Sequence, residues 1–289
     1  MKTERKILAL FLVMAMLLTQ MVGFTLDISA ETTTGSCNRN ITWAFDSETG
    51  VLTVEGTGSM PDYGNGSAPW YSLRAKITAV KVAEGVEKVG KYAFGGLTAL
   101  TEVSLPESLL ILGEYAFSGC TALRSIHIPE NVTLLYGNTF AYCPLDTLTA
   151  DVANEFYYVD GGCLINILNG ELVAGTNSAV IPDDGMVEGI AAYAFSGRTA
   201  LTGVTIPDSV TAVGAYAFDG CTALTGVTVP DSVTAIKDHA FHGCTALTDA
   251  VIGEGVTSVG TAAFYNCTAL ENLTVGSSVK SIGQSAFYN

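Results

Sequence analysis

The chain has 289 residues, of which 48% are hydrophobic and 14% are charged, so it has enough apolar side chains to offset the entropy of folding and is not intrinsically disordered. Acidic residues outnumber basic residues 28 to 13, and the net charge is −15. Nucleic acids and anionic membrane surfaces would be repelled by this charge and are excluded as partners.

The first thirty residues have the pattern of a secretory signal peptide. Basic residues precede the apolar run Ile7–Leu18, and Ile28–Ala30 offers a cleavage site. The alternative is an uncleaved anchor, which the polar residues Thr19 and Gln20 would interrupt. We predict a signal peptide over residues 1–30, a secreted or cell-surface location, and no membrane insertion after cleavage.

Residues 31–76 lack the repeat found later in the chain and have strand-like patterns instead. The runs Ile41–Phe45 and Val51–Glu55 flank a short turn, which predicts a hairpin. A repeat stack has to close its terminal apolar face, and the only tryptophans, Trp43 and Trp70, are suited to that task. We predict a β-rich N-terminal cap; the functional alternative is a carbohydrate site built on these tryptophans.

From residue 77 to residue 289 the sequence repeats with a period of 23 residues, and Leu201–Ala223 is almost identical to Leu224–Ala246. Such a period is typical of a solenoid, because one unit cannot bury its own apolar face. Within a unit, two short strands are followed by a single helical turn around a phenylalanine that points into the core. The fold class predicted is a mainly β repeat solenoid of 23-residue coils. Its phenylalanines recur at Phe94, Phe117, Phe140, Phe195, Phe218, Phe241, Phe264 and Phe287.

The period is disturbed after Leu145, where the Ala-Phe turn is missing. Apolar runs at Phe156–Tyr158, Cys163–Leu168 and Glu171–Ala174 are joined by glycine-containing turns. We predict a hairpin insertion over residues 154–175 that stands out from the edge of the solenoid.

The unit LTGVTIPDSVTAVGAYAFDGCTA resembles the BspA-like, or Treponema-type, leucine-rich repeats of bacterial surface proteins. The likeness covers residues 77–289, and its specific marker is the Ala-Phe-x-Gly-Cys-Thr turn. The lead-in NITWAFDSETGVLTVEGTGSMPDY is similar to the β-rich segment that often precedes these repeats. The resemblance implies a leucine-rich repeat fold, a surface-exposed protein of a host-associated bacterium, and adhesion or protein binding. It supplies no catalytic residues. Thr139, Leu97 and Arg198 depart from the repeat pattern without disrupting the fold.

Two further columns follow from the period. Five cysteines share one repeat position and are expected in the core, with disulfides such as Cys120–Cys143 left open; they are Cys120, Cys143, Cys221, Cys244 and Cys267.

An acidic residue follows the first strand in six coils, at Glu84, Glu107, Glu130, Asp208, Asp231 and Glu254. Like charges raise a carboxylate pKa, so stability is expected to rise modestly as the pH falls, with weak, non-specific calcium binding. The alternative is that these acids cap the backbone.

No pattern of catalytic residues is present. The pair His239 and His242 lies near Asp238 but lacks a third ligand at suitable spacing, and we expect it on a solvated surface. The chain has no nucleophile elbow, phosphate-binding loop or Cys-x-x-Cys pair. We therefore predict a protein that is not an enzyme and that has no cofactor and no metal site.

The candidate binding residues lie two and four positions after the first leucine of each coil, where side chains point away from the core. They are Glu102, Ser104, Ser125, His127, Thr147, Thr149, Thr205, Thr228, Asp249, Asn272 and Thr274. This face is small and neutral and lacks the aromatic and arginine anchors of tight interfaces, which predicts a broad, weak, multivalent contact. A column of tyrosines is expected to shield the turn, with partner binding as its alternative; it contains Tyr92, Tyr115, Tyr193 and Tyr216.

Two functions of different kinds are compatible with these patterns. The first is a secreted or cell-surface binding and adhesion module whose partner is an extracellular protein or glycan of host or microbial origin. The second is a non-catalytic spacer or recognition arm of a larger secreted protein or enzyme that continues beyond Asn289.

Overall fold

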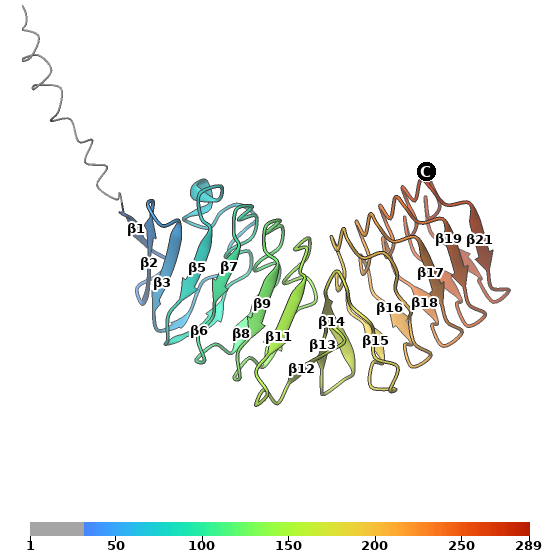
Figure 1. Cartoon of the computed structure of the whole chain (residues 1–289), viewed down its shortest axis with the longest axis horizontal. Coiled ribbons are helices and arrows are strands. Elements are labelled where there is room, and N and C mark those ends of the chain that lie inside the picture. Colours follow the sequence, from blue (N-terminus) through green and yellow to red (C-terminus); the bar gives the residue numbers. More distant parts are fainter. Residues whose placement is uncertain (1–31) are drawn as a thin grey trace, which may run out of the picture. The chain divides into compact units, whose positions relative to one another are not determined.

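Short strands from successive coils stack side by side in the structure, a computed structural model that describes residues 32–289. The predicted signal peptide lies outside the described residues. Figure 1 shows the coils following one another in chain order from β1 to β21. The predicted β solenoid is confirmed.

One side of the stack carries the longer strand of each coil. The predicted hairpin is present as β2 and β3, and β3 pairs in parallel with β5, so the cap continues directly into the first coil. The strands form three sheets, β1-β2-β3-β5-β7, β9-β11 and β17-β19-β21. Their bounds are Thr32–Ser36 (β1), Ile41–Asp46 (β2), Val51–Gly56 (β3), Ala79–Val82 (β5), Glu102–Ser104 (β7), Ser125–Ile128 (β9), Thr147–Ala150 (β11), Gly226–Val229 (β17), Asp249–Ile252 (β19) and Asn272–Val275 (β21).

The second side carries shorter strands, which form the sheets β4-β6-β8-β10 and β12-β13-β14-β15-β16-β18-β20-β22. Their bounds are Gly58–Ser59 (β4), Val86–Val89 (β6), Ile111–Leu112 (β8), Leu134–Leu135 (β10), Tyr157–Asp160 (β12), Cys163–Asn166 (β13), Glu171–Gly175 (β14), Gly189–Ile190 (β15), Ala212–Val213 (β16), Ala235–Ile236 (β18), Ser258–Val259 (β20) and Ser281–Ile282 (β22). Within residues 32–289 the only helix is the 3₁₀ turn η1 at Tyr71–Leu73. The single helical turn predicted around each repeat phenylalanine is therefore wrong: these residues form hydrogen-bonded turns that are not helical.

The turns after the second strands form a third side of each coil, here called the turn side. In these turns, backbone N–H groups bond alternately within the turn and to the next coil: Asp219 N–H donates to Tyr216 O (3.2 Å), and Phe218 N–H donates to Ala240 O (2.7 Å). Tyr216 has a left-handed backbone (φ 58°), which turns the chain between these two directions. The same conformation recurs at Tyr92, Tyr115, Tyr193, His239, Ala262 and Ser285.

The core is a column of stacked phenylalanine rings. Neighbouring centroids are 4.9 Å apart for Phe195 and Phe218 and 5.8 Å apart for Phe117 and Phe140. At the N-terminal end, Trp70 stacks on Phe94 at 5.6 Å and its indole N–H donates to Ala93 O (2.9 Å). Trp70 therefore covers the end of the column, as predicted for a cap.

The cysteine column lies in the core, as predicted. Each thiol donates to the carbonyl of the phenylalanine one coil earlier, as Cys221 does to Phe195 O at 3.1 Å. All seven cysteines are free thiols in the described residues, so the disulfide Cys120–Cys143 left open above is not formed here. Burial raises the pKa of Cys221 to about 12, which keeps its thiol protonated and able to donate.

The segment predicted as a projecting hairpin contains three antiparallel strands, but it does not project. This segment, Tyr157–Gly175, is called the central unit. Its residues Leu164 and Leu172 are fully buried, and β14 pairs in parallel with β15 of the next coil. The prediction of an edge insertion is therefore wrong: the central unit replaces part of a coil inside the stack.

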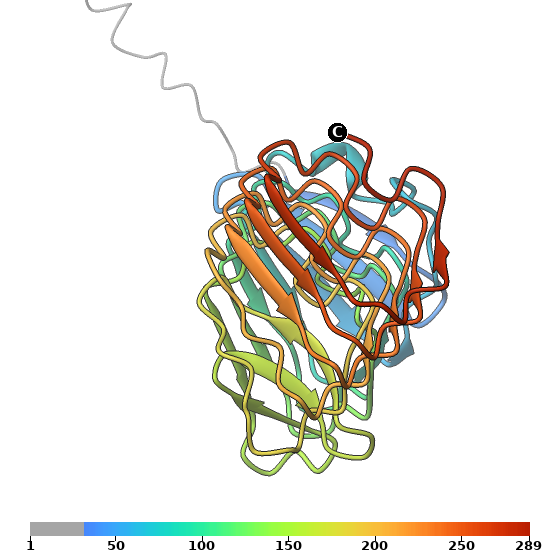
Figure 2. The same cartoon turned by 90° about the vertical axis from the view of Figure 1, so that its right-hand side faces the viewer.

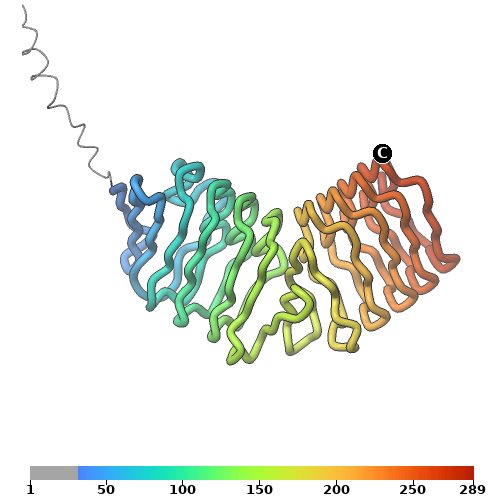
Figure 3. The backbone as a smooth tube through the Cα atoms, viewed as in Figure 1, coloured from blue at the N-terminus to red at the C-terminus, as the bar shows by residue number. Residues whose placement is uncertain are grey.

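The stack bends at the central unit, as Figures 1 and 3 show. On the turn side, the disturbed coil contributes no turn, and Tyr142 N–H donates directly to Ser196 O (3.0 Å). On the opposite side, the central unit adds strands between β10 and β15. Because one side is shortened and the other lengthened, the axis of the stack has to bend there. Figure 2 shows the stack from its C-terminal end.

Arg198 holds this junction together from inside. It occupies the cysteine position of the repeat but is fully buried. Its guanidinium donates to Gly175 O (2.5 Å), to Phe140 O (3.3 Å) and to Cys143 O. Burial lowers the pKa of Arg198 to about 10. The arginine thus connects the coil of Phe140 and Cys143 to the end of the central unit.

Candidate binding surfaces

The exposed side of the longer strands, here called the strand face, brings the predicted binding residues together. Parallel pairing aligns equivalent positions: Lys81 is opposite Ser104, His127 opposite Thr149, and Thr228 opposite Val251. All eleven predicted residues are exposed. Side-chain contacts within the face are local; Asn272 donates to Asp249 Oδ1 at 2.8 Å.

Hydrogen bonds also set the charge state of the face. The hydroxyl of Thr248 and the amide of Asn272 donate to Asp249, and in that order they lower the pKa of its carboxyl. Asp249 therefore stays ionised well below neutral pH. The face is polar and shallow, and it carries the carboxylates of Asp249 on β19 and Glu102 on β7.

Thr205 is the one predicted residue that lies outside a strand. The strand expected at Leu201–Ile206 is absent, and the sheet is interrupted between β11 and β17. In the coil before it, Val180 N–H donates to Gly161 O in the turn between β12 and β13 (2.7 Å). The equivalent segment of that preceding coil is not a strand either, so the Thr205 segment has a neighbouring strand, β17, on one side only. The strand face is therefore divided among three sheets, and two successive coils without a strand separate β11 from β17.

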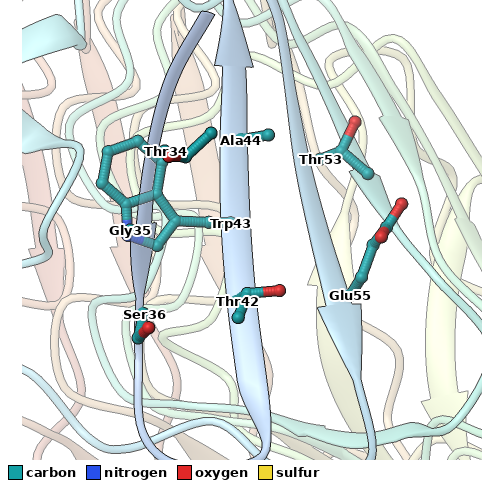
Figure 4. A pocket seen from close by; sticks show the side chains of 8 residues that line it. All are labelled: Thr34, Gly35, Ser36, Thr42, Trp43, Ala44, Thr53 and Glu55. Atoms are coloured by element: carbon teal, nitrogen blue, oxygen red, sulfur yellow. The ribbon is translucent and has the colours of Figure 1, made fainter.

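The cap extends the strand face further than the sequence analysis predicted. Thr34, Ala44 and Thr53 are opposite one another on β1, β2 and β3, and Thr53 is opposite Lys81. Figure 4 shows this region, in which small side chains leave a hollow of about 450 Å³ beside Thr42 and Glu55. The alternating pattern of the cap strands was the signal that could have identified these positions.

Neither tryptophan offers a free ring face for a carbohydrate site. Trp43 lies across Gly35, where a Cβ atom would come within 2.7 Å of its indole (Figure 4). Its exposed fraction is 8%, and that of Trp70 is 0%. The two rings pack edge to face at 5.8 Å, so both belong to the capping core.

The acidic column caps backbone N–H groups. Glu84 accepts from Glu107 N–H (2.9 Å), and Glu254 accepts from the N–H and the hydroxyl of Ser277 (both 2.7 Å). These bonds to Ser277 lower the pKa of Glu254. The expected rise of the carboxylate pKa from like-charge repulsion is therefore wrong at this position, because hydrogen bonds to the ionised form outweigh it.

The tyrosine column on the turn side is a stack of rings. Tyr92 and Tyr115 stack at 4.9 Å, and Tyr193 and Tyr216 at 4.8 Å. Across the bend, Tyr115 and Tyr193 instead meet edge to face at 5.8 Å. Burial and a hydrogen bond with Tyr115 raise the pKa of Tyr193. The column shields the turns, as expected.

His239 and His242 lie on this aromatic surface, where both are partly exposed and both also stack on a neighbouring ring. His239 stacks on Tyr216 at 4.5 Å with 6° between the ring planes. His242 stacks on Tyr265 at 5.4 Å, and its Nδ1 is 2.7 Å from Asp219 Oδ1. The spacing of 23 residues between Tyr216 and His239 was the missed signal. Within residues 32–289 no three metal-binding side chains are grouped, and no helix is long and apolar enough to span a membrane.

The comparisons with known proteins agree with this architecture. The family described as BspA type leucine rich repeat region matches six times, over residues 70–166 and 175–289. The chain belongs to the BspA-type leucine-rich repeat family. The resemblance stated from the repeat unit is thereby confirmed, and the leucine-rich repeats include the cap tryptophan Trp70. The search among curated proteins gave no match.

Several solved structures are similar to this chain. The pneumococcal vaccine antigen PcpA is 17% identical, with a TM-score of 0.59 and coverage of 87% of this chain and 85% of that chain. A leucine rich cell surface protein from Faecalibacterium prausnitzii is 20% identical, with a TM-score of 0.47 and coverage of 84% and 94%. A leucine-rich repeat protein from Eubacterium ventriosum is 21% identical, with a TM-score of 0.43 and coverage of 89% and 95%.

Proposed function

We propose that this leucine-rich repeat protein is an extracellular adhesion module that binds a macromolecule through its strand face. The observation that carries the proposal is the shared register of the outward-facing side chains of β1, β2, β3, β5 and β7, which include Thr34, Thr53 and Ser104. Such a face offers many equivalent weak contacts to an extended partner, and their summed effect can give useful avidity.

Three further observations support this reading. The predicted signal peptide over residues 1–30 would export the chain, the family is one of bacterial surface-type proteins, and a neighbour in fold is described as a pneumococcal vaccine antigen. The partner would be an extracellular protein or glycan. The chain carries no arrangement of side chains in residues 32–289 that calls for a catalytic role, and we propose a binding role alone.

The proposal is tested by capture of the purified mature chain on immobilised mucin and extracellular-matrix proteins. The double variant Thr149→Arg/Thr228→Arg changes two exposed positions of the strand face. The matched control, Leu134→Arg/Ser281→Arg, changes exposed positions on the second side. Loss of capture only in the first variant supports the proposal. Absence of capture by the unmodified chain, or equal capture by both variants, contradicts it.

A further inference from the structure

The ring column on the turn side changes at its C-terminal end. Tyr193, Tyr216 and His239 stack in successive coils at 4.8 and 4.5 Å. The next two positions of the column are Ala262 and Ser285. Their φ angles of 51° and 54° match the 57° of His239, so the backbone continues unchanged while the side chains no longer supply rings.

A hollow of about 290 Å³ lies where those rings would stand. Tyr216 covers one face of the His239 ring, so the other face is turned toward the coil of Ala262. In that coil, the backbone carbonyl of Thr261 accepts from the backbone N–H of His239 (2.9 Å). His242 and Tyr265 also line the hollow. The apolar surface of the hollow therefore comes from the free face of the His239 ring, the rings of His242 and Tyr265, and the methyl group of Ala262.

The remaining lining is polar and uncharged. Thr261 and Ser285 contribute hydroxyl groups, and Gln284 contributes an amide. A hydroxyl and an amide can each donate and accept hydrogen bonds. The hollow thus combines an apolar ring surface with several neutral hydrogen-bonding groups, which is the usual composition of a site for a small polar ligand.

We propose that this hollow binds one neutral pyranose ring of a glycan. The C–H face of a sugar packs on an aromatic face, and its hydroxyls pair with the hydroxyl and amide groups. An aromatic side chain of a partner protein would leave those polar groups unused. The carboxylates of Asp219 and Asp238 lie beside the hollow and would repel an anionic sugar. Asp219 bonds to His242, and Asp238 accepts from Thr261 N–H (2.7 Å). This site goes beyond the proposed strand-face function and is independent of it.

The three histidines provide a direct readout, since His239 and His242 line the hollow and His127 lies on the strand face. The methyl glycosides of galactose, mannose and N-acetylglucosamine are titrated into the mature chain while the histidine ring signals are followed by NMR. We expect at least one sugar to shift the signals of His239 and His242 in a saturable manner and to leave His127 in place. If none of the three does so, the proposal is wrong.

A variant that restores the ring column provides the second test. Ala262→Tyr places a tyrosine at a position whose backbone already matches the tyrosine positions, so its ring should fill the hollow and abolish the sugar-dependent shifts. Leu134→Tyr, at an exposed position on the second side, is the matched control and should bind as the unmodified chain does. Gln284→Ala removes one polar partner and should weaken binding about threefold to tenfold. Unchanged affinity in both Ala262→Tyr and Gln284→Ala would overturn the proposal.

Discussion

The regular coils and the central unit solve the same packing problem in different ways. In a regular coil, each position meets its own equivalent in the neighbouring coil, as Phe218 meets Phe195 and Phe241. In the central unit, no position meets an equivalent. The hydroxyl of Tyr157 instead accepts from Leu135 N–H in the preceding coil (2.9 Å). On the other side, β14 pairs with β15 of the next coil. The repeated residues thus determine the cross-section of the stack. The central unit determines where the stack bends, and it joins the coils before it to the coils after it.

The largest expected effect comes from deleting the central segment. Removal of residues 154–175 takes away buried Leu164 and Leu172 together with the pairing of β14 with β15. We expect loss of cooperative unfolding, measured by urea denaturation with circular dichroism. This outcome differs from what a projecting hairpin would give, which is an intact solenoid.

A matched deletion sharpens this test. Removing one whole regular coil, Leu224–Ala246, joins two coils whose equivalent positions are in register. That variant should fold and unfold cooperatively at a lower urea concentration, since one coil interface is lost. Equal behaviour of the two deletion variants would show that the central unit is no different from an ordinary coil.

A smaller effect is expected from single phenylalanines. Phe218 is fully buried between two rings, so Phe218→Ala should destabilise the fold by roughly 3–5 kcal/mol. Phe287 stacks on Phe264 alone and is partly exposed, so Phe287→Ala should have a much smaller effect. Urea midpoints measure both, and similar losses at the two sites would argue against a linear stack.

Arg198 tests the junction itself. Arg198→Leu places at this position the residue type found at Leu97, its equivalent in the first coil. We expect a loss of about 1–3 kcal/mol, because the Gly175 carbonyl loses its side-chain donor and the Phe140 carbonyl keeps only the N–H of Cys143. Removal of a buried cation partly offsets this loss. Cys221→Ala is the control in a regular coil and should cost less, since one carbonyl is affected. A more stable Arg198→Leu protein would contradict this role.

The smallest effect concerns pH. The bonds from Ser277 lower the pKa of Glu254 from 4.5, so its contribution to folding stability is present above the unfolded pKa and is lost as the pH falls through the folded value. The melting temperature should therefore decrease modestly below about pH 4.5, the reverse of the expectation from repulsion alone. The difference between the unmodified chain and Glu254→Gln should vanish at low pH. A melting temperature that rises relative to Glu254→Gln on acidification would refute this account.

The period was sufficient to predict the coils, because each residue type recurs where the same backbone and the same neighbours recur. Phe218, Cys221 and the cap hairpin at β2 and β3 are where the sequence placed them. The central unit could be predicted only as strands. Glycine-containing turns indicate a hairpin but do not show whether its apolar side chains are buried. Their burial in the central unit depends on how the two flanking coils meet, where a turn is missing and Tyr142 N–H donates to Ser196 O.

The strand face was predictable for the same reason, since alternation fixes which side chains point outward. Its interruption at Thr205 was not, because the sequence there keeps the strand pattern while the preceding coil packs against the central unit, where Val180 N–H donates to Gly161 O. The hollow beside His239 was missed although its signal was present. The histidine occupies a tyrosine position, and the change to Ala262 one coil later is visible in the printed sequence.

The central claim is that the central unit joins the two halves into one cooperative structure. Urea unfolding followed with two local probes tests it most directly. Tryptophan fluorescence reports only the N-terminal end, because Trp43 and Trp70 are the only tryptophans, and the NMR signals of His239 and His242 report the C-terminal half. We predict coincident midpoints for the unmodified chain. Two separate midpoints would contradict the claim and show that the halves unfold independently.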